Sequence, residues 1–307
     1  MAENGVTRLA VFGHPVTHSL SPAIHQRFAD ACRISVDYRA IDCPAGHLAE
    51  HLARFQATGG IGCNLTVPLK SEGLGLAASA SAEAREAGAC NTLRWSESGW
   101  QAYNTDAAGL VVDFRRLGIP LRQRRILIVG AGGAVAGILG ALIRQRPEFI
   151  CLLNRDAAKA QRLAARFAAL DIHADGAASA DLNSGAAKPG DKSPGDKSPD
   201  GTKLVAAGLD QGPPESNFDL LIQGTSLGHQ GLCPNIDPGW LADDAIGYDL
   251  NYGAAYQAFD CWGSSAGVPT RSGIGMLVEQ AALAFEIFTG QRPSTAAVHQ
   301  WLGKSET

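Results

Sequence analysis

Three short polar stretches carry the side chains best suited to chemistry on a small molecule: GCNLTVPLK (62–70), GACNT (88–92) and YNTD (103–106). Each places an amide and a hydroxyl at or near the end of an expected strand. A lysine, such as Lys70, is normally protonated near neutral pH and can donate a proton, and a carboxylate such as Asp106 can orient it. Together the stretches predict a donor- and acceptor-rich wall for a polyhydroxylated substrate. Taken singly, each fits a turn or a helix cap, and Asp106 alone fits an N-cap.

A second polar stretch, HSLSPAIHQRF (18–28), precedes an apolar helical pattern. Ser21 followed by Pro22 predicts an N-cap with proline at the first helical position. Ser19 is not needed for that cap, and two hydroxyls at a helix N-terminus also suit an anion. These residues are compatible both with a helix cap alone and with a binding site for an anion.

The stretch RRILIVGAGGAVAGILGALI (124–143) predicts a dinucleotide-binding turn. Residues 125–129 form an expected strand, 130–133 a tight glycine turn and 134–143 an apolar helix. Glycines there allow a pyrophosphate to approach the backbone, and the N–H groups of the helix N-terminus attract it.

The choice of dinucleotide depends on LLNRDAAK (152–159). An NAD-binding domain usually has an acidic residue at the end of its second strand, where this sequence has Asn154 and Arg155, with Lys159 one turn further. An amide and two cations favour the 2′-phosphate of NADP, although Asp156 would repel it. The alternative is that Arg155 is a solvated surface charge.

Strands and helices alternate along the chain, which predicts βαβ units and a mainly parallel sheet. The expected strands are 8–12, 38–41, 62–67, 125–129, 149–153, 218–222 and 245–249. The expected helices start at 22 and span 47–57, 106–117, 134–143, 157–170, 272–290 and 294–302, the last capped by Ser294. Residues 186–203, in which GDKSP occurs twice, predict a disordered insertion in a surface loop, either neutral or used for recruitment.

Composition excludes several classes of function. The 307 residues carry a formal net charge of -4, which gives no electrostatic footprint for nucleic acid or an acidic membrane. Neither a signal peptide nor a membrane span is expected. Seven cysteines without a CxxC pair fit a reducing cytosol, so a cytoplasmic location is expected.

No metal site is expected, because no cysteine or carboxylate completes a ligand set with His14, His18 and His25. Cys63 and Cys90 are expected to be small buried apolar residues rather than nucleophiles.

The motifs, taken in order, resemble the shikimate dehydrogenase family over nearly the whole chain apart from 186–203. The residues that carry this resemblance are HSLSP, NLTVPLK, GACNT, NTDAAG, GAGGA, NRDAAK, GTSLG, YDLNY and GIGMLVEQAALAF. The resemblance implies an α/β fold with an N-terminal substrate-binding domain, a Rossmann-type NADP-binding domain and an active-site cleft between them. It assigns 1–106 and 271–307 to the first domain and 107–270 to the second. The implied activity is the NADP-dependent, reversible reduction of 3-dehydroshikimate to shikimate.

The resemblance also implies roles for individual residues. Lys70 and Asp106 would be the catalytic pair. The substrate would be bound by Ser19 and Ser21 at its carboxylate, by Asn64, Thr66, Asn91, Asp106 and Gln280 at its ring hydroxyls, and by Tyr252 beside it. NADP(H) would be held by Gly130, Ala131, Gly132, Gly133, Ala134, Asn154, Arg155 and Lys159, with Leu250 and Gly273 on the nicotinamide side.

The sequence departs from the family pattern near the expected cofactor site. Gln223 stands where asparagine is usual and His229 where methionine is usual, and further departures are Ala254, Gln257 and Ser272. One alternative is therefore a quinate/shikimate dehydrogenase with relaxed substrate or cofactor use. Another is a non-catalytic paralogue that binds shikimate, although binding alone would not need both Lys70 and Asp106. The expected partner is a small-molecule substrate, and a homodimer is left open.

Overall fold

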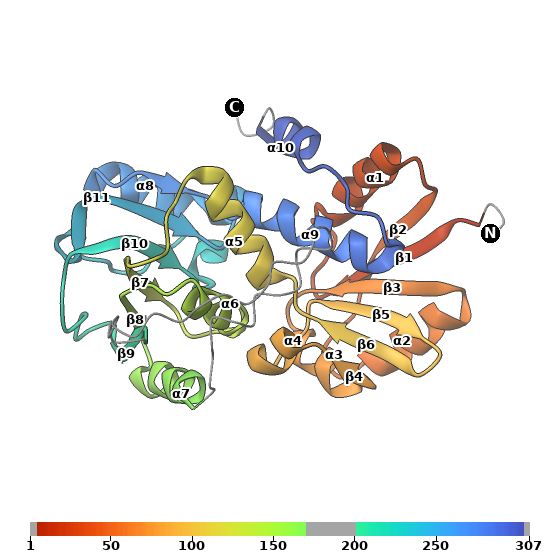
Figure 1. Ribbon diagram of the computed structural model, residues 1–307, viewed down its shortest axis with the longest axis horizontal. Coiled ribbons are helices and arrows are strands. Elements are labelled where there is room, and N and C mark those ends of the chain that lie inside the picture. Colours follow the sequence, from red (N-terminus) through yellow and green to blue (C-terminus); the bar gives the residue numbers. More distant parts are fainter. Residues whose placement is uncertain (1–4, 170–200, 304–307) are drawn as a thin grey trace, which may run out of the picture.

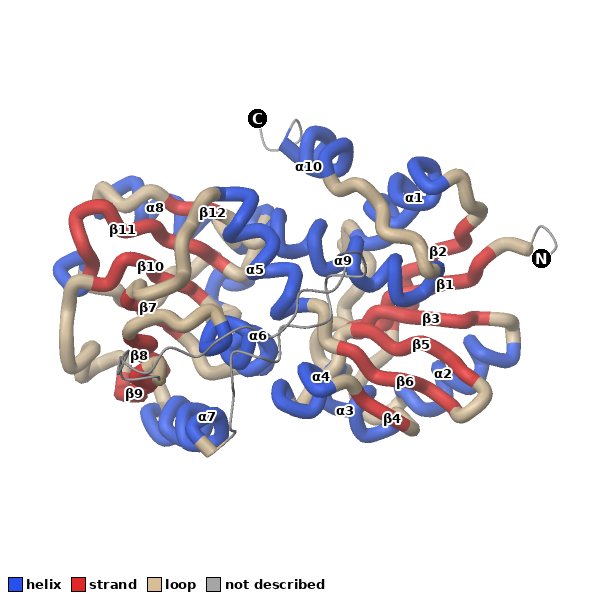
Figure 2. The backbone as a smooth tube through the Cα atoms, in the orientation of Figure 1, coloured by secondary structure: helices blue, strands red, loops and turns tan. Residues whose placement is uncertain are grey.

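The computed structural model describes residues 5–169 and 201–303. It has two lobes, each built on a six-stranded sheet (Figure 1). Two helices, α5 (Asp106–Leu117) and α9 (Ile274–Thr289), lie between the lobes and pack against each other (Figure 2). The mixed α/β architecture with two sheets confirms the fold class predicted from the sequence.

The N-terminal sheet has the strand order β2-β1-β3-β5-β6-β4. Its strands are β1 (Thr7–Gly13), β2 (Val36–Asp42), β3 (Gly60–Leu65), β4 (Ser79–Ala80), β5 (Thr92–Ser96) and β6 (Gly99–Tyr103). Its helices are α1 (Ser21–Cys32), α2 (Leu48–Ala57), α3 (Lys70–Leu76) and α4 (Ala82–Ala87). The prediction of a mainly parallel sheet is wrong for the middle of this one, because β5 runs antiparallel to both β3 and β6.

The second sheet has the order β9-β8-β7-β10-β11-β12, and all its neighbouring strands are parallel. Its strands are β7 (Arg125–Val129), β8 (Phe149–Asn154), β9 (Lys203–Gly208), β10 (Phe218–Gln223), β11 (Leu241–Asp249) and β12 (Thr270–Arg271). In chain order this is the 3-2-1-4-5-6 arrangement of a Rossmann fold, in which ligands bind where the order reverses. That point lies between β7 and β10.

Helices cover both faces of the second sheet. Its helices are α6 (Gly133–Arg144), α7 (Ala157–Ala168) and α8 (Gln257–Ala266). Neighbouring residues of a strand point to opposite faces, so Ile126 and Leu127 enter different cores. Ile126 packs with residues of α5, α6 and α7, and Leu127 packs with Phe259 of α8. This two-sided burial explains why the strands are uninterrupted apolar runs.

The C-terminal part of the chain returns to the N-terminal lobe. Helix α9 packs on α5 so closely that a Cβ added at Gly109 would lie 2.7 Å from the backbone nitrogen of Gln280. Helix α10 (Ala296–Gly303) follows and is tied to α9 by His299, whose Nε2 lies 2.7 Å from Glu279 Oε1. Gln280 is thereby delivered to the N-terminal lobe from the other end of the sequence.

The lobes also meet through α4 and α6. Arg144 of α6 pairs with Glu86 of α4 at 2.8 Å, and Arg166 of α7 donates to the backbone carbonyls of Glu86 and Ala87. These contacts hold the second sheet's helices against the N-terminal lobe.

Several expected helix ends differ from the structure. Helix α1 begins at Ser21 with Leu20 as its N-cap, so Ser21 is not the cap; instead Ser19 Oγ accepts from the Ser21 backbone N–H at 3.2 Å. Asp106 is the first residue of α5 and Thr105 its N-cap. The carbonyl of Thr295, not Ser294, accepts the first N–H groups of α10.

Other expected bounds shift as well. The third strand ends at Leu65 rather than 67, because the chain turns at Thr66, whose carbonyl accepts from the Leu69 N–H. Most of the expected insertion, 186–200, lies outside the described residues, but Lys203 at its end is already part of β9 and pairs with Phe149. Within the described part of the chain, no helix is long and apolar enough to cross a membrane.

Candidate active site

Lys70 and Asp106 form a close ion pair at the edge of the N-terminal sheet. Lys70 opens α3 just after β3, and Asp106 opens α5 just after β6. Their Nζ and Oδ2 atoms lie 2.5 Å apart, and their side chains are 25% and 11% exposed. A hydrogen-bonded ammonium and carboxylate that stay partly exposed can hold a proton and transfer it.

Asn91 organises the carboxylate of Asp106. Its Nδ2 group donates to Asp106 Oδ1 at 2.8 Å, to Thr105 Oγ1 at 2.8 Å and to Gln280 Oε1 at 3.2 Å. Asp106 therefore presents one oxygen to Asn91 and the other to Lys70. The contact with Gln280 shows that α9 completes this wall.

Asn64 joins the same network from β3. Its Nδ2 group donates to the Asn91 carbonyl at 3.2 Å and to Thr92 Oγ1 at 3.0 Å, and its Oδ1 accepts from the Tyr38 hydroxyl at 2.7 Å. The structure thus brings five of the predicted residues into one hydrogen-bonded network: Asn64, Lys70, Asn91, Asp106 and Gln280. Tyr38 was not singled out from the sequence, since it reads there as an ordinary inward residue of a strand.

The two serines and Thr66 border this network. Ser21 is buried, and its side chain interacts with the Tyr38 hydroxyl, while Ser19 is partly exposed. Thr66 packs directly on Gly13, where an added Cβ would lie 2.3 Å from Thr66 Cγ2. The two polar segments that follow β1 and β3 therefore lie next to each other.

Tyr252 is partly buried and lies on the opposite lobe, after β11. Burial raises the pKa of its hydroxyl. It makes no hydrogen bond to the polar network among residues 5–169 and 201–303.

The glycine turn lies where the strand order of the second sheet reverses. Gly130 has a φ of +121°, and a Cβ there would lie 2.8 Å from the Gly224 carbonyl oxygen, so only glycine fits. Cβ atoms added at Gly132 or Gly133 would meet no atom within 4 Å. The N-terminus of α6 therefore faces open space, and its free N–H groups fit a pyrophosphate.

The residues expected to determine the preference for NADP over NAD follow β8, beside this turn. Arg155 and Lys159 are exposed, and neither has an ion-pair partner among the residues described. Asp156, which the sequence suggested would oppose a phosphate, is the N-cap of α7, and its side chain accepts from the Lys159 backbone N–H at 3.2 Å. Asn154 Nδ2 donates to the Asp156 carbonyl at 3.0 Å.

Leu250 and Gly273 touch on the other side of the turn. A Cβ added at Gly273 would lie 2.5 Å from the Leu250 carbonyl oxygen. The preceding Asp249 is fully buried, and burial raises the pKa of its carboxyl to about 6. Its Oδ1 accepts from both the backbone N–H and the side chain of Asn251, which fixes the loop that carries Leu250.

The two halves of the site meet at α6. A Cβ added at Gly137 would lie 3.5 Å from Asn104 Nδ2 and 3.9 Å from Asp106 Oδ2. The helix that starts at the glycine turn therefore passes directly beside the carboxylate of the Lys70–Asp106 pair.

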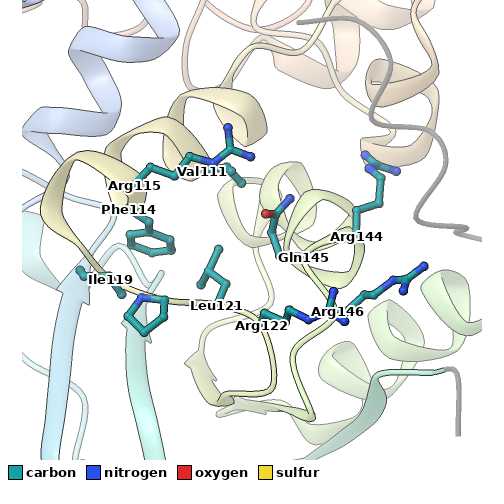
Figure 3. Close-up of a pocket in the computed structure, with 10 residues that line it drawn as sticks. Val111, Phe114, Arg115, Ile119, Leu121, Arg122, Arg144, Gln145 and Arg146 are labelled. Carbon is teal, nitrogen blue, oxygen red and sulfur yellow. The ribbon is translucent and has the colours of Figure 1, made fainter. Parts of the chain in front are cut away.

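A separate pocket of about 450 Å³ lies at the far ends of α5 and α6 (Figure 3). Phe114 and Leu121 form its apolar floor, and Arg115 and Arg122 stand at its rim. None of the site residues predicted from the sequence lines it. Because both helices end there, the basic side chains are explained by the negative ends of the helix dipoles.

The histidine and cysteine side chains that the structure describes form no second site. The part of the chain that the structure describes contains no group of three or more His, Cys, Asp or Glu residues arranged to hold a metal ion. His14 pairs with Asp42 at 2.8 Å. Cys63 and Cys90 are fully buried as expected, and burial raises the pKa of both thiols, that of Cys90 to about 12.

The chain is similar to known proteins over nearly its whole length. Residues 11–93 match the model of the shikimate dehydrogenase substrate binding domain, 115–181 match that of shikimate/quinate 5-dehydrogenase, and 273–300 match that of the shikimate 5′-dehydrogenase C-terminal domain. A shikimate dehydrogenase (NADP(+)) from Acidovorax ebreus is 41% identical over 293 residues, which cover 95% of this chain and 94% of the relative. The chain belongs to the shikimate dehydrogenase family.

Solved structures of the shikimate dehydrogenase family share the fold. A shikimate 5-dehydrogenase from Thermus thermophilus, in complex with NADP(H) and shikimate, is 28% identical with a TM-score of 0.75 and covers 95% of this chain and 96% of its own. An Ael1 enzyme from Pseudomonas putida is 31% identical with a TM-score of 0.79 and covers 96% of this chain and 98% of its own.

Within the shikimate dehydrogenase family pattern, Gln223 is the most deeply buried of the departures. Its Oε1 accepts from the Thr225 backbone N–H, and its side chain also donates toward Asp249. The longer amide is thus accommodated by bonds to the turn after β10, next to the carboxyl end of β11.

Proposed function

We propose that this protein catalyses the NADP-dependent, reversible reduction of 3-dehydroshikimate to shikimate. The observation that carries the proposal is the Lys70–Asp106 pair, held at 2.5 Å by Asn91 and lying beside the helix that starts at the glycine turn. The relative from Acidovorax ebreus is named for this activity and cofactor, and the Thermus thermophilus enzyme was solved with NADP(H) and shikimate.

The chain's own residues supply the proton transfer. NADPH, when bound, supplies the hydride that converts the C3 carbonyl into an alcohol. Lys70 donates a proton from Nζ to the oxygen on C3 as negative charge develops there. Asp106 Oδ2 holds the ammonium in place, and Asn91 fixes the second carboxylate oxygen. In the direction of oxidation, the neutral Lys70 amine accepts the proton of the alcohol.

The remaining side chains of the wall bind the substrate in this proposal. Ser19 and Ser21, at the start of α1, hold its carboxylate, because hydroxyls and helix N-terminal N–H groups both donate to anions. Asn64, Thr66, Asn91 and Gln280 bind the ring hydroxyls, and Tyr252 closes the site from the other lobe.

The cofactor is assigned to the second lobe. Gly130, Ala131, Gly132, Gly133 and Ala134 hold the pyrophosphate at the N-terminus of α6, where the structure leaves open space. Asn154, Arg155 and Lys159 bind the ribose 2′-phosphate, and Leu250 and Gly273 line the nicotinamide side.

The proposal divides the chain into a substrate-binding domain (1–106 and 271–307) and an NADP-binding domain (107–270). It includes a cytoplasmic location and action on a small molecule without nucleic acid or membrane. The homodimer that the sequence leaves open can be tested by light scattering after size exclusion.

A second candidate is a quinate/shikimate dehydrogenase with relaxed cofactor use. Gln223 at the cofactor side favours it, as does the match of residues 115–181 to a model that covers both substrates. Initial rates with shikimate or quinate and with NADP or NAD separate the two candidates. Shikimate oxidation with NADP that is lost in Lys70→Ala supports the first. A preference for quinate or NAD supports the second, and shikimate binding without turnover supports a non-catalytic paralogue.

A further inference from the structure

Tyr38 is a buried side chain that the reaction does not use but that touches the substrate wall. It lies on β2, and Asn64 lies on β3, with β1 between them. Tyr38 pairs with Leu9 and Asn64 with Val11, two residues that point to the same face of the sheet. The Tyr38 hydroxyl therefore reaches over β1 and donates to Asn64 Oδ1 at 2.7 Å.

The orientation of the Asn64 amide follows from its partners. The Asn91 backbone carbonyl can only accept, so the group that faces it at 3.2 Å must be the Asn64 amide N–H. The second N–H goes to Thr92 Oγ1, whose own proton points to Asn91 Oδ1 at 2.9 Å. Both donors of Asn64 are thus engaged within the protein. Only the second lone pair of Oδ1 is left for a ligand.

The tyrosine ring is held in one position. His25 stacks on it with ring centroids 4.2 Å apart and an angle of 17° between the planes. Burial lowers the pKa of His25 to about 3 and raises the pKa of Tyr38 well above its usual value. Both rings are therefore neutral at working pH, and Tyr38 remains a hydrogen-bond donor.

We propose that Tyr38 is a positioning residue for substrate binding, which fixes Asn64 so that this side of the site offers a hydrogen-bond acceptor and no donor. The site then favours substrates that have a ring hydroxyl able to donate a hydrogen bond to Asn64. The inference deepens the proposed function and rests on it, since Asn64 is assigned there to a ring hydroxyl of shikimate.

The test is Tyr38→Phe, which removes the hydroxyl and keeps the ring stacked on His25. Loss of this buried bond leaves Asn64 Oδ1 without its fixed donor, so KM for shikimate should rise about tenfold. The values of kcat and of KM for NADP should change less than about twofold, because Lys70, Asp106 and the glycine turn are untouched. Tyr256→Phe is the matched control, because it too removes a hydrogen-bonded tyrosine hydroxyl. The partners of that hydroxyl are Asp260 and Thr270, and it lies on the second lobe, away from Asn64.

A double-mutant cycle distinguishes positioning through Asn64 from a general loss of packing. In an Asn64→Ala background, Tyr38→Phe removes only the contact between the Tyr38 hydroxyl and Ser21, so it should raise KM for shikimate by less than about twofold further. An unchanged KM in Tyr38→Phe, or the same tenfold increase with and without Asn64, overturns the inference and leaves the proposed function standing.

Substrate analogues provide a measurement that depends on no variant. Fluorine in place of a ring hydroxyl keeps a weak acceptor and removes the donor. At either C4 or C5, the wild-type protein should discriminate against the fluoro compound as strongly as against the deoxy compound. Fluoro analogues tolerated better than deoxy analogues at both positions contradict the inference. If the wild type neither binds nor oxidises shikimate, the proposed function fails first.

Discussion

Lys70→Ala is the substitution that tests the proposed chemistry most directly. Lys70 is 25% exposed, and its Nζ is 2.5 Å from Asp106 Oδ2. The variant removes the group that donates the proton in reduction and accepts it in oxidation, whereas Asp106 keeps its bond from Asn91 and so its place. General acid catalysis contributes roughly 10²- to 10⁴-fold, so kcat should fall by about that factor, equivalent to about 2.7–5.5 kcal/mol of barrier.

The assay is the initial rate of NADPH formation from shikimate, followed by the absorbance of the reduced nicotinamide. KM for shikimate should change much less than kcat, because most substrate contacts in the proposal come from other residues. Lys70→Arg tests whether the positive charge alone is sufficient. The variant keeps a cation next to Asp106, but a guanidinium stays protonated and does not exchange a proton with the substrate, so it should rescue little activity.

Lys203→Ala is the matched control. Lys203 also forms a close ion pair, with Glu215 at 2.6 Å, but on the exposed surface of β9. Its loss removes the same charge and should leave kcat unchanged. The reasoning is refuted if Lys70→Ala retains kcat within a few-fold of the wild type, or if Lys203→Ala loses as much.

Three further predictions concern the second lobe. Gly130→Ala should lower the free energy of unfolding by about 1–3 kcal/mol, because its φ of +121° and the nearby Gly224 carbonyl leave no room for a Cβ. Gly132→Ala should have the melting temperature of the wild type but a higher KM for NADP, because the added Cβ fills the open space at the turn. Removing the cations of Arg155 and Lys159 together should raise KM for NADP at least tenfold and leave KM for NAD nearly unchanged; equal effects on both cofactors contradict the assignment. Burial raises the pKa of Asp249 from 3.8 to about 6, so the wild type loses stability as the pH rises from about 4 through about 6. The free energy of unfolding of Asp249→Asn, measured from unfolding curves, should therefore increase relative to that of the wild type by about 2.4 kcal/mol between pH 4 and pH 8.

The second lobe was the more predictable of the two from sequence. The strand at 125–129 and the helix at 106–117 have the expected bounds, because an apolar run before glycines and a glycine stop after a helix are strong local signals. The antiparallel β5–β6 pair was missed. Its strands are five residues each and alternate only partly, so their pairing depends on contacts with β3 that no local pattern encodes.

The site was predictable in its residue types but not in its connections. Lys70 and Asp106 can be found because a charged residue ends two of the three polar stretches. The role of Asn91 in holding Asp106, and of Tyr38 in holding Asn64, depends on which side chains meet across strands and is set by tertiary packing. The N-caps of α1 and α5 were misplaced by one residue because the actual caps, Leu20 and Thr105, form no side-chain cap hydrogen bond that a sequence pattern could indicate.

The return of α9 to the first lobe has a consequence for biosynthesis. Gln280 reaches Asn91 across 189 positions of the chain, and Phe285 packs against Phe28 of α1. A ribosome must therefore translate almost the entire message before the first lobe can bury this face of α1. Until then the nascent chain exposes apolar surface, which makes it a substrate for chaperones. A truncation before residue 274 should accordingly leave an aggregation-prone fragment even though both sheets have been synthesised.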